Sequence, residues 1–176
     1  MFPLLFYFHN ILLIRFLKQG ELCFIIKQDV KNITLEEAPN FILGYTAGND
    51  ISSRLWQRPP RSGGQYCYAK GFDKFAPIGP TLRNATKTNL SDLALRTKVN
   101  GEERQCTSFN SMIFQPYEIL AHLSKGCTVR KGTVVMTGTP QGIAGRMAGT
   151  PWLQHGDVVE VTIDQIGRIS NRMVMN

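Results

Sequence analysis

The stretch "LALRTKVNGEERQ", residues 93–105, decides the fold class most clearly. Apolar and polar residues alternate before Asn100-Gly101, and a strand-like run resumes after this pair, as in two strands that each bury one face. Asn-Gly between two such runs is the strongest short-range hairpin signal, because both residues tolerate the positive φ angles of a type I′ turn. The stretch therefore predicts an antiparallel hairpin.

A second alternating stretch, "GDVVEVTIDQIGRISNRM" (156–173), supports the same fold class. Val159, Val161 and Ile163 fall on one face of a strand, and Gly167 marks a turn into another. Two shorter segments also have the character of strands: residues 21–27 and 132–140.

Two segments are expected to be helical. "TLEEAPNFILGYT" (34–46) opens with Thr34 and Glu37 at the spacing of a capping box, and Gly44 punctuates its end. "QPYEILAHLSKG" (115–126) carries apolar residues at helical spacing. Since no βαβ unit repeats, the chain is expected to adopt an α+β, strand-rich fold with short helices.

The composition is that of an ordinary globular chain of 176 residues, 43% hydrophobic and 19% charged, and one domain is expected. The net charge is +7, yet lysine and arginine are scattered without a block or stripe. No aromatic-basic signature of RNA binding is present, so no nucleic-acid partner is expected. The charge either favours a small anionic substrate or is incidental, and the second interpretation is favoured.

Four cysteines lie far apart, without a C-x-x-C pair. This spacing argues against a zinc site, and a disulfide framework is not expected in a chain of this size. We therefore expect buried free thiols.

Residues 1–17, "MFPLLFYFHNILLIRFL", differ from the rest of the chain because they are apolar and contain no acidic residue. The run is shorter than the roughly 20 apolar residues of a membrane helix. It also lacks the charge and small-residue pattern of a signal peptide and the Arg/Ser content of a transit peptide. We expect residues 1–18 to be a separate segment before a domain at 19–176, and a cytoplasmic or mitochondrial location. A membrane-tethered binding protein that uses residues 1–17 as its anchor is the less favoured alternative.

Three polar stretches could carry chemistry, and each has a simpler structural explanation. Asp50 in "GNDISSR" could be a ligand, although aspartate is common in turns and that role is favoured from the residues alone. "TGTPQGI" (137–143) could present backbone N–H groups to an anion, or could be an ordinary turn after a strand. Lys70 in "AKGFDKF" could hold an anion or stabilise an enolate, whereas base rates favour an exposed lysine.

The pair Gln19 and Glu21 in "LKQGELCFIIK" (17–27) raises a related question. Positions two apart in a strand share a face, so both side chains are expected to point into the same space. They could form half of a metal site or merely a solvated strand edge.

Taken together, six stretches resemble the C-terminal domain of the fumarylacetoacetate hydrolase family, in order and spacing, from about Gln19 to Arg172. Within that family the chain is most similar to the small acylpyruvate hydrolase and isomerase type. The stretches are "GYTAGNDISSRLWQ", "KGFDKFAPIGP", "VNGEERQ", "MIF", "GTVVMTGTPQGI" and "GDVVEVTIDQIGRISNR".

The resemblance implies a mixed β-sandwich roll, a homodimer, and a bound Mg²⁺ or Mn²⁺ ion. The family holds the ion with an E-x-E strand pair and an aspartate in an N-D-[VI]-S turn. Here Glu21 matches the second glutamate and Asp50 the aspartate, 29 residues later, as in the small members. Gln19 stands where the first glutamate is usual.

The resemblance also implies a reaction and a substrate pocket. Arg54, Gln57, Lys70 and Thr139 match positions that line the pocket in the family. The expected reaction is metal-dependent hydrolysis of a C–C bond in a 2,4-diketo acid, with Lys70 and the metal stabilising the pyruvate enolate. An isomerase, an oxaloacetate decarboxylase, and a catalytically impaired subunit that dimerises are the alternatives.

Three features depart from the family pattern. Gln19 offers an amide oxygen without charge, which should weaken metal binding by more than the roughly 10–100-fold typical of second-shell changes. Residues 1–17 do not resemble the N-terminal lid that supplies a water-activating His and Glu, so we expect the chain to lack it. In "SFNSM" (108–112), Phe109 replaces a small polar residue and is expected to crowd the pocket.

Overall fold

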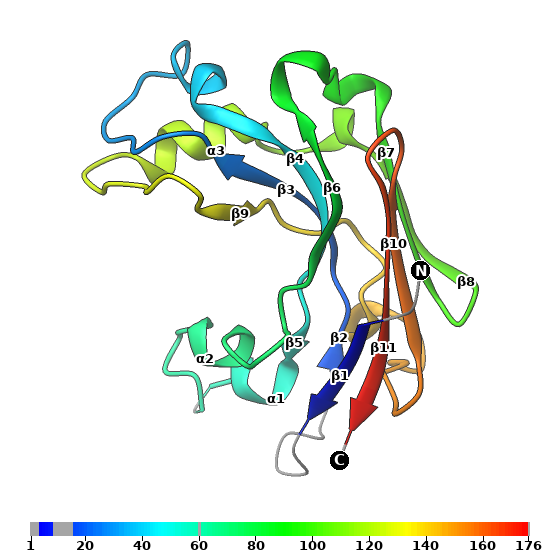
Figure 1. Ribbon diagram of the computed structural model, residues 1–176. Helices are drawn as coiled ribbons and strands as arrows, with labels where there is room; N and C mark the ends of the chain where they lie inside the picture. The colour runs from blue at the N-terminus through cyan, green and yellow to red at the C-terminus, as the bar shows by residue number, and fades with distance from the viewer. Residues whose placement is uncertain (1–3, 9–15, 60, 176) are drawn as a thin grey trace.

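The computed structural model describes residues 4–8, 16–59 and 61–175. The described chain forms three β-sheets with short helices between them, which confirms the strand-rich α+β prediction (Figure 1). The largest sheet has five strands in the order β1 (Leu4–Phe8), β11 (Gly167–Met175), β10 (Val158–Ile163), β7 (Ala94–Val99) and β8 (Glu102–Ser108).

The second sheet has four strands and carries the candidate site at one end. Its order is β6 (Ile78–Asn84), β4 (Ile42–Asn49), β3 (Gly20–Ile26) and β9 (Val134–Met136). A two-stranded sheet joins β2 (Phe16–Leu17) to β5 (Ser52–Ser53). The α-helices are α1 (Arg54–Gln57), α2 (Cys67–Lys70) and α3 (Pro116–Leu123). The 3₁₀ turns are Ala38–Phe41, Ala85–Lys87, Leu90–Asp92, Phe109–Ser111 and Ala144–Arg146.

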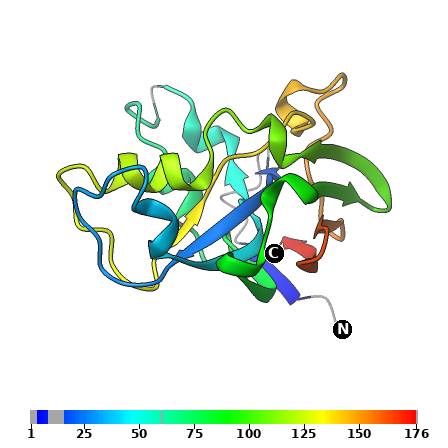
Figure 2. The same ribbon diagram turned by 90° about the horizontal axis from the view of Figure 1, so that it is seen from above.

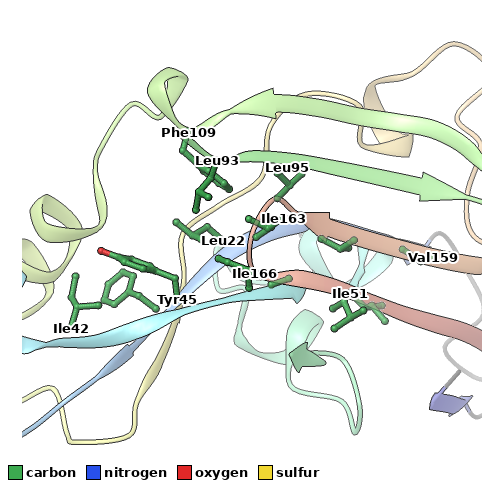
Figure 3. Packing of buried hydrophobic residues seen from close by; sticks show 14 of the residues in the cluster. Leu22, Ile42, Tyr45, Ile51, Leu93, Leu95, Phe109, Val159, Ile163 and Ile166 are labelled. Carbon is green, nitrogen blue, oxygen red and sulfur yellow. The ribbon is translucent and has the colours of Figure 1, made fainter. Parts of the chain in front are cut away.

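The main core lies between the two larger sheets. Leu22 of β3 faces Leu95 of β7 and Ile163 of β10, and Phe109 packs beyond them (Figure 3). Burial of such side chains is the main stabilising contribution to a fold of this kind. Seen from above, α3 lies on one side of the molecule and the β7–β8 hairpin on the other (Figure 2).

The hairpin predicted at residues 93–105 is confirmed. β7 and β8 pair antiparallel, and Asn100 and Gly101 adopt φ angles of 52° and 85°. These positive values are those that a type I′ turn requires. The strands predicted from 156–173 also form, as the antiparallel pair β10 and β11.

The helix predicted at 34–46 is wrong over most of its length. The capping box does form, since Glu37 accepts from the Thr34 N–H at 2.8 Å and the Thr34 hydroxyl accepts from the Glu37 N–H at 3.3 Å. Only a 3₁₀ turn, Ala38–Phe41, follows it before β4 begins at Ile42. β4 pairs with β3 and β6 inside its sheet, and all of its residues except one are buried, so its apolar run lacks the alternation that distinguishes a strand from a buried helix.

The second predicted helix is confirmed as α3, which ends at Leu123. The longest helix in the described part of the chain is this one, and none there is long and apolar enough to cross a membrane. The expectation for the cysteines is only partly right: all four are free, but Cys23 alone is buried, because the others lie on exposed helical, strand and loop positions.

At the N-terminal end, β1 pairs in parallel with β11 and becomes an edge strand of the five-stranded sheet (Figure 1). Residues 1–3 and 9–15 of the predicted separate segment lie outside the described residues. The division at residue 18 stays a prediction.

Candidate metal and substrate site

The ends of two neighbouring strands bring Gln19 and Asp50 together. β3 and β4 pair antiparallel, with Gly20 opposite Asn49 and Glu21 opposite Gly48. Just beyond the ladder, the Asp50 N–H donates to the Gln19 carbonyl at 2.9 Å. Residues 27 to 31 positions apart in sequence are thus adjacent because the strands are hydrogen-bonded partners.

Asp50 is buried within a small network of side chains. The Lys70 ammonium forms an ion pair with its carboxylate, and the Gln19 Nε2 donates to Oδ2 at 3.4 Å. The Ser52 hydroxyl lies 3.5 Å from Oδ1 and accepts from Gln19 Nε2 at 2.9 Å and from Lys70 Nζ at 3.1 Å. Asp50 is therefore positioned by a cation, an amide and a hydroxyl.

Glu21 is held differently, by the backbone of the turn after β9. The Gly138 N–H donates to Glu21 Oε2 at 2.9 Å. Gly138 has a φ of 93°, a conformation that glycine adopts without steric cost. Burial raises the pKa of the Glu21 carboxyl, and the Gly138 hydrogen bond and the nearby Lys70 charge oppose that rise.

Lys70 is the cation that both carboxylates share. Its side chain is about one-third exposed, and burial lowers its pKa while the charge of Glu21 opposes this shift. With two carboxylates and one ammonium, the charged side chains of the group sum to −1 when all are ionised, an environment that favours a further cation.

Thr139 follows Gly138 and is committed to the protein framework. Its hydroxyl donates to the Gly20 carbonyl at 3.0 Å and accepts from Gln105 Nε2 at 2.8 Å. The prediction that this hydroxyl holds a substrate carboxylate stays a prediction, and it would require a rearrangement of these bonds.

Arg54 and Gln57 lie on α1, where Arg54 Nη1 donates to Gln57 Oε1 at 2.9 Å. α1 contacts α2 through an edge-to-face pair of Trp56 and Tyr68, whose ring centroids are 5.0 Å apart. This aromatic contact links the helix of Arg54 to the helix of Lys70, so the predicted substrate residues are on neighbouring elements.

The oxygen-bearing side chains of this site can be compared with the ligands that a hard divalent cation prefers. Within the described ranges, no three His, Cys, Asp or Glu side chains come together as a metal-binding group. Glu21, Asp50 and the Gln19 amide nevertheless offer oxygen atoms from one strand end, and oxygen ligands are what Mg²⁺ and Mn²⁺ prefer. The residues fit such an ion with one negative charge fewer than a set of three carboxylates.

A cavity of about 460 Å³ is lined in part by Gly138 and Thr139. It is lined by Leu22 and Phe109, among others, but not by Asp50 or Lys70. Phe109 therefore borders this cavity and is not among the residues that contact Asp50. The expected crowding of the substrate pocket by Phe109 stays a prediction.

Three further residues, Ser52, Gln105 and Lys18, support this region, and the sequence did not point to them as site residues. Ser52 lies within the stretch that drew attention to Asp50, and Gln105 ends the predicted hairpin, but neither residue type carries a signal at its position. Lys18 is buried, donates to the Gly142 carbonyl at 3.3 Å, and has its pKa lowered to about 7 by burial and by the charge of Arg104.

Comparison with known proteins identifies the family. Residues 14–174 match the family described as "Fumarylacetoacetate (FAA) hydrolase C-terminal". The chain is 40% identical over 159 residues to an "Oxaloacetate tautomerase fahd2, mitochondrial" of Xenopus laevis, covering 89% of this chain and 49% of that protein. It is 36% identical over 156 residues to the "Oxaloacetate tautomerase YisK" of Bacillus subtilis, covering 88% of this chain and 51% of that protein.

Solved structures are similar over nearly the whole chain. The fumarylacetoacetate hydrolase from the psychrophile Exiguobacterium antarcticum matches with a TM-score of 0.91 and 32% identity, covering 99% of this chain and 62% of that one. A 5-carboxymethyl-2-hydroxymuconate delta-isomerase from Mycobacterium smegmatis matches with a TM-score of 0.87 and 32% identity, covering 99% and 64%.

The chain spans about half the length of the curated relatives it matches. The family match covers most of the sequence, and the fold agrees with solved members. The chain belongs to the fumarylacetoacetate hydrolase family and comprises that family's C-terminal domain.

Proposed function

We propose that this chain catalyses the metal-assisted keto–enol interconversion of a small 2-keto acid of the oxaloacetate type. The observation that carries the proposal is the position of the Lys70 ammonium, against Asp50 and Ser52 and close enough to Glu21 for their charges to interact. Two curated relatives at 40% and 36% identity are named oxaloacetate tautomerases, which favours this isomerase alternative over the hydrolase that the sequence suggested first.

In this proposal Glu21, Asp50 and Gln19 hold a Mg²⁺ or Mn²⁺ ion. When bound, such an ion polarises the keto group of the substrate as a Lewis acid. All three donors come from the paired ends of β3 and β4, so their spacing is set by strand pairing and not by flexible loops.

The chain's own residues would bind the acid and stabilise its enolate. In the reaction a C3–H bond breaks, a C2–C3 double bond forms, and the proton is taken up at the C2 oxygen. Lys70 would stabilise the negative charge that develops on that oxygen. Arg54 and Gln57 would bind a carboxylate of the substrate, since a guanidinium group matches a carboxylate in shape and charge. Thr139 is the remaining proposed substrate contact.

Hydrolysis of an acylpyruvate passes through the same enolate and remains the first alternative. It requires, in addition, attack of water on the distal carbonyl and cleavage of the C–C bond, and hence a base that activates the water.

A catalytically impaired subunit is a second candidate, and Gln19 is the observation that favours it. Its Nε2 donates to Asp50 and Ser52, so the amide serves as a donor within the network where a glutamate would be a ligand. In this case the chain would contribute to a dimer with an active relative. Size-exclusion chromatography with light scattering would test the homodimer that we propose for the chain itself.

A mitochondrial or cytoplasmic location is likewise proposed, since the Xenopus relative is named as mitochondrial. Subcellular fractionation would test it. Nucleic acid is not a proposed partner, because the basic residues do not form a block in the sequence.

The activity is tested by following the enol absorbance of freshly dissolved oxaloacetate with Mg²⁺ or Mn²⁺, and in parallel the diketo absorbance of acetylpyruvate. We expect faster loss of the oxaloacetate enol, dependence on metal, and loss of the effect after chelation and in Lys70→Met. Cleavage of acetylpyruvate without effect on oxaloacetate would instead establish the hydrolase. No effect on either substrate, in folded protein with saturating metal, would leave only the impaired subunit.

A further inference from the structure

The side chain of Gln105 joins the two halves of the candidate site from the interior of the protein. Gln105 lies in β8 and is only 2% exposed. Its Oε1 accepts from the Gly20 N–H at 3.1 Å, while its Nε2 donates to the Thr139 hydroxyl at 2.8 Å and to the Pro140 carbonyl at 3.0 Å. One amide thus connects the strand of Gln19 and Glu21 to the turn after β9.

The orientation of this amide follows from its partners. The Gly20 N–H can only donate and the Pro140 carbonyl can only accept, so the oxygen must face Gly20 and the nitrogen must face the turn. Since both hydrogens of Nε2 are then used, the Thr139 oxygen is an acceptor for one of them. The hydrogen of the Thr139 hydroxyl is consequently directed to the Gly20 carbonyl, 3.0 Å away.

Gly20, the first residue of β3, lies between the candidate ligands Gln19 and Glu21, and it has room only for hydrogen. A Cβ atom there would lie 2.1 Å from the Thr97 hydroxyl and 3.3 Å from Gln105 Oε1. The strand backbone is therefore pressed against β7 and β8 at this point, which is what allows Gln105 to reach it. The Gly20 N–H donates to Gln105 Oε1, and the Gly20 carbonyl accepts from the Thr139 hydroxyl.

We infer that Gln105 is a positioning residue that fixes the strand of Gln19 and Glu21 relative to the Gly138–Thr139 turn and sets the direction of the Thr139 hydroxyl. It acts from the face of β3 opposite to Glu21, since alternate residues of a strand point to opposite sides. Its effect on turnover rests on the proposed function. Its effect on the turn itself does not.

The test uses two variants of the full chain that separate the two ends of the amide. Gln105→Met removes all three hydrogen bonds with little change in volume. Gln105→Glu keeps an acceptor for the Gly20 N–H but cannot donate to Thr139 or Pro140. Gln28→Met, at an exposed position far from the site, is the matched control. Measurements are made at a temperature at which denaturant curves show every variant to be folded.

Three readouts are compared: amide hydrogen exchange at Gly138 without metal or substrate, the dissociation constant of Mn²⁺ by calorimetry, and kcat and KM for oxaloacetate. For Gln105→Met we expect faster exchange at Gly138, and about a ten-fold rise in both KM and the Mn²⁺ dissociation constant, as for other groups that orient ligands. For Gln105→Glu we expect the rise in KM and the faster exchange, with a smaller change in Mn²⁺ binding.

Unchanged exchange at Gly138 and unchanged Mn²⁺ binding in both folded variants, with only a lower unfolding midpoint, would overturn the inference and leave Gln105 as a purely structural residue. If Gln105→Met does not fold, the divergence between KM and Mn²⁺ binding in Gln105→Glu decides the question. If the wild type turns over no oxaloacetate, the proposed function fails, whereas the exchange at Gly138 still tests the role of Gln105.

Discussion

Asp50 and Glu21, the two carboxylates of the candidate site, are held in place by different kinds of partner. Asp50 is surrounded by side chains, those of Lys70, Ser52 and Gln19. Glu21 accepts from a backbone N–H, that of Gly138. A backbone donor persists whenever the turn keeps its conformation, whereas side-chain partners depend on residue identity. We call Asp50 with Lys70, Ser52 and Gln19 the Asp50 half of the site, and Glu21 with the turn after β9 the Glu21 half. Substitutions of side chains should therefore change metal and substrate binding through the Asp50 half more readily than through the Glu21 half.

The largest effect is expected from Asp50→Asn, which removes a charged ligand and leaves Lys70 without its ion-pair partner. Since changes of second-shell groups already cost 10–100-fold in affinity, loss of this ligand should weaken Mn²⁺ binding by more than about 100-fold. Calorimetric titration measures this loss. Asp73→Asn, at an exposed position, is the control, and wild-type affinity in Asp50→Asn would show that the ion binds elsewhere.

The next largest effect is expected on stability, from Lys18. This residue belongs to the Glu21 half, because its ammonium donates to the Gly142 carbonyl of the turn after β9. Burial and the charge of Arg104 lower its pKa from 10.5 to about 7. The folded state then loses the proton near pH 7 while the unfolded chain retains it. Stability must therefore rise with pH above about 7, by about 2 kcal/mol between pH 7 and 8.5.

The check is chemical denaturation of the wild type and Lys18→Met between about pH 6 and 8.5, below the range in which the raised pKa of Cys23, about 12, has an opposite effect. We expect the free energy of unfolding of the wild type to rise relative to that of Lys18→Met as the pH rises. Lys27→Met, at an exposed position, should follow the wild type. Parallel pH profiles for all three would show that Lys18 is charged in the folded state throughout.

Lys70→Met should separate the two roles of the ammonium. Loss of a group that stabilises a developing oxyanion typically costs about 100–1,000-fold in kcat, and we expect about 100-fold here. Mn²⁺ binding should tighten at the same time, because a competing cation leaves Asp50. Enol assays and calorimetry measure the two effects, with Lys87→Met as an exposed control. A fall in metal affinity would mean that Lys70 orients Asp50 for the ion.

Gln19→Glu restores the third carboxylate and tests how much metal affinity the Asp50 half loses through its glutamine. A second charge near the ion should tighten Mn²⁺ binding by about 10–100-fold, offset in part by repulsion from Asp50. Calorimetry against Gln28→Glu as control would measure the gain. If affinity does not change, residue 19 is not a ligand, and the correspondence of this strand with the family motif is wrong.

The sequence predicted the strands and hairpins where apolar residues alternate, and the family resemblance singled out Glu21, Asp50 and Lys70, which the structure places close together. It could not distinguish β4 from a helix, because a strand buried on both faces has no alternation to read. It could not identify Gln105 either. That residue acts through contacts 34 and 85 positions away, and nothing local in the hairpin reports them.

Ser52→Ala should give the smallest effect. It measures how much the Ser52 hydroxyl contributes to the Asp50 half of the site. The fully buried Ser52 hydroxyl accepts from Gln19 and Lys70, so its loss leaves both donors with one partner fewer. A lost hydrogen bond of this kind costs about 1 kcal/mol of stability, and we expect a change in KM of about three-fold. The matched control is Ser53→Ala, because Ser53 is equally buried and its hydroxyl has no hydrogen-bond partner among the described residues. Equal effects of the two substitutions on stability and on KM would show that the hydrogen bonds of the Ser52 hydroxyl contribute nothing measurable. The position of Asp50 would then depend on Lys70 and Gln19.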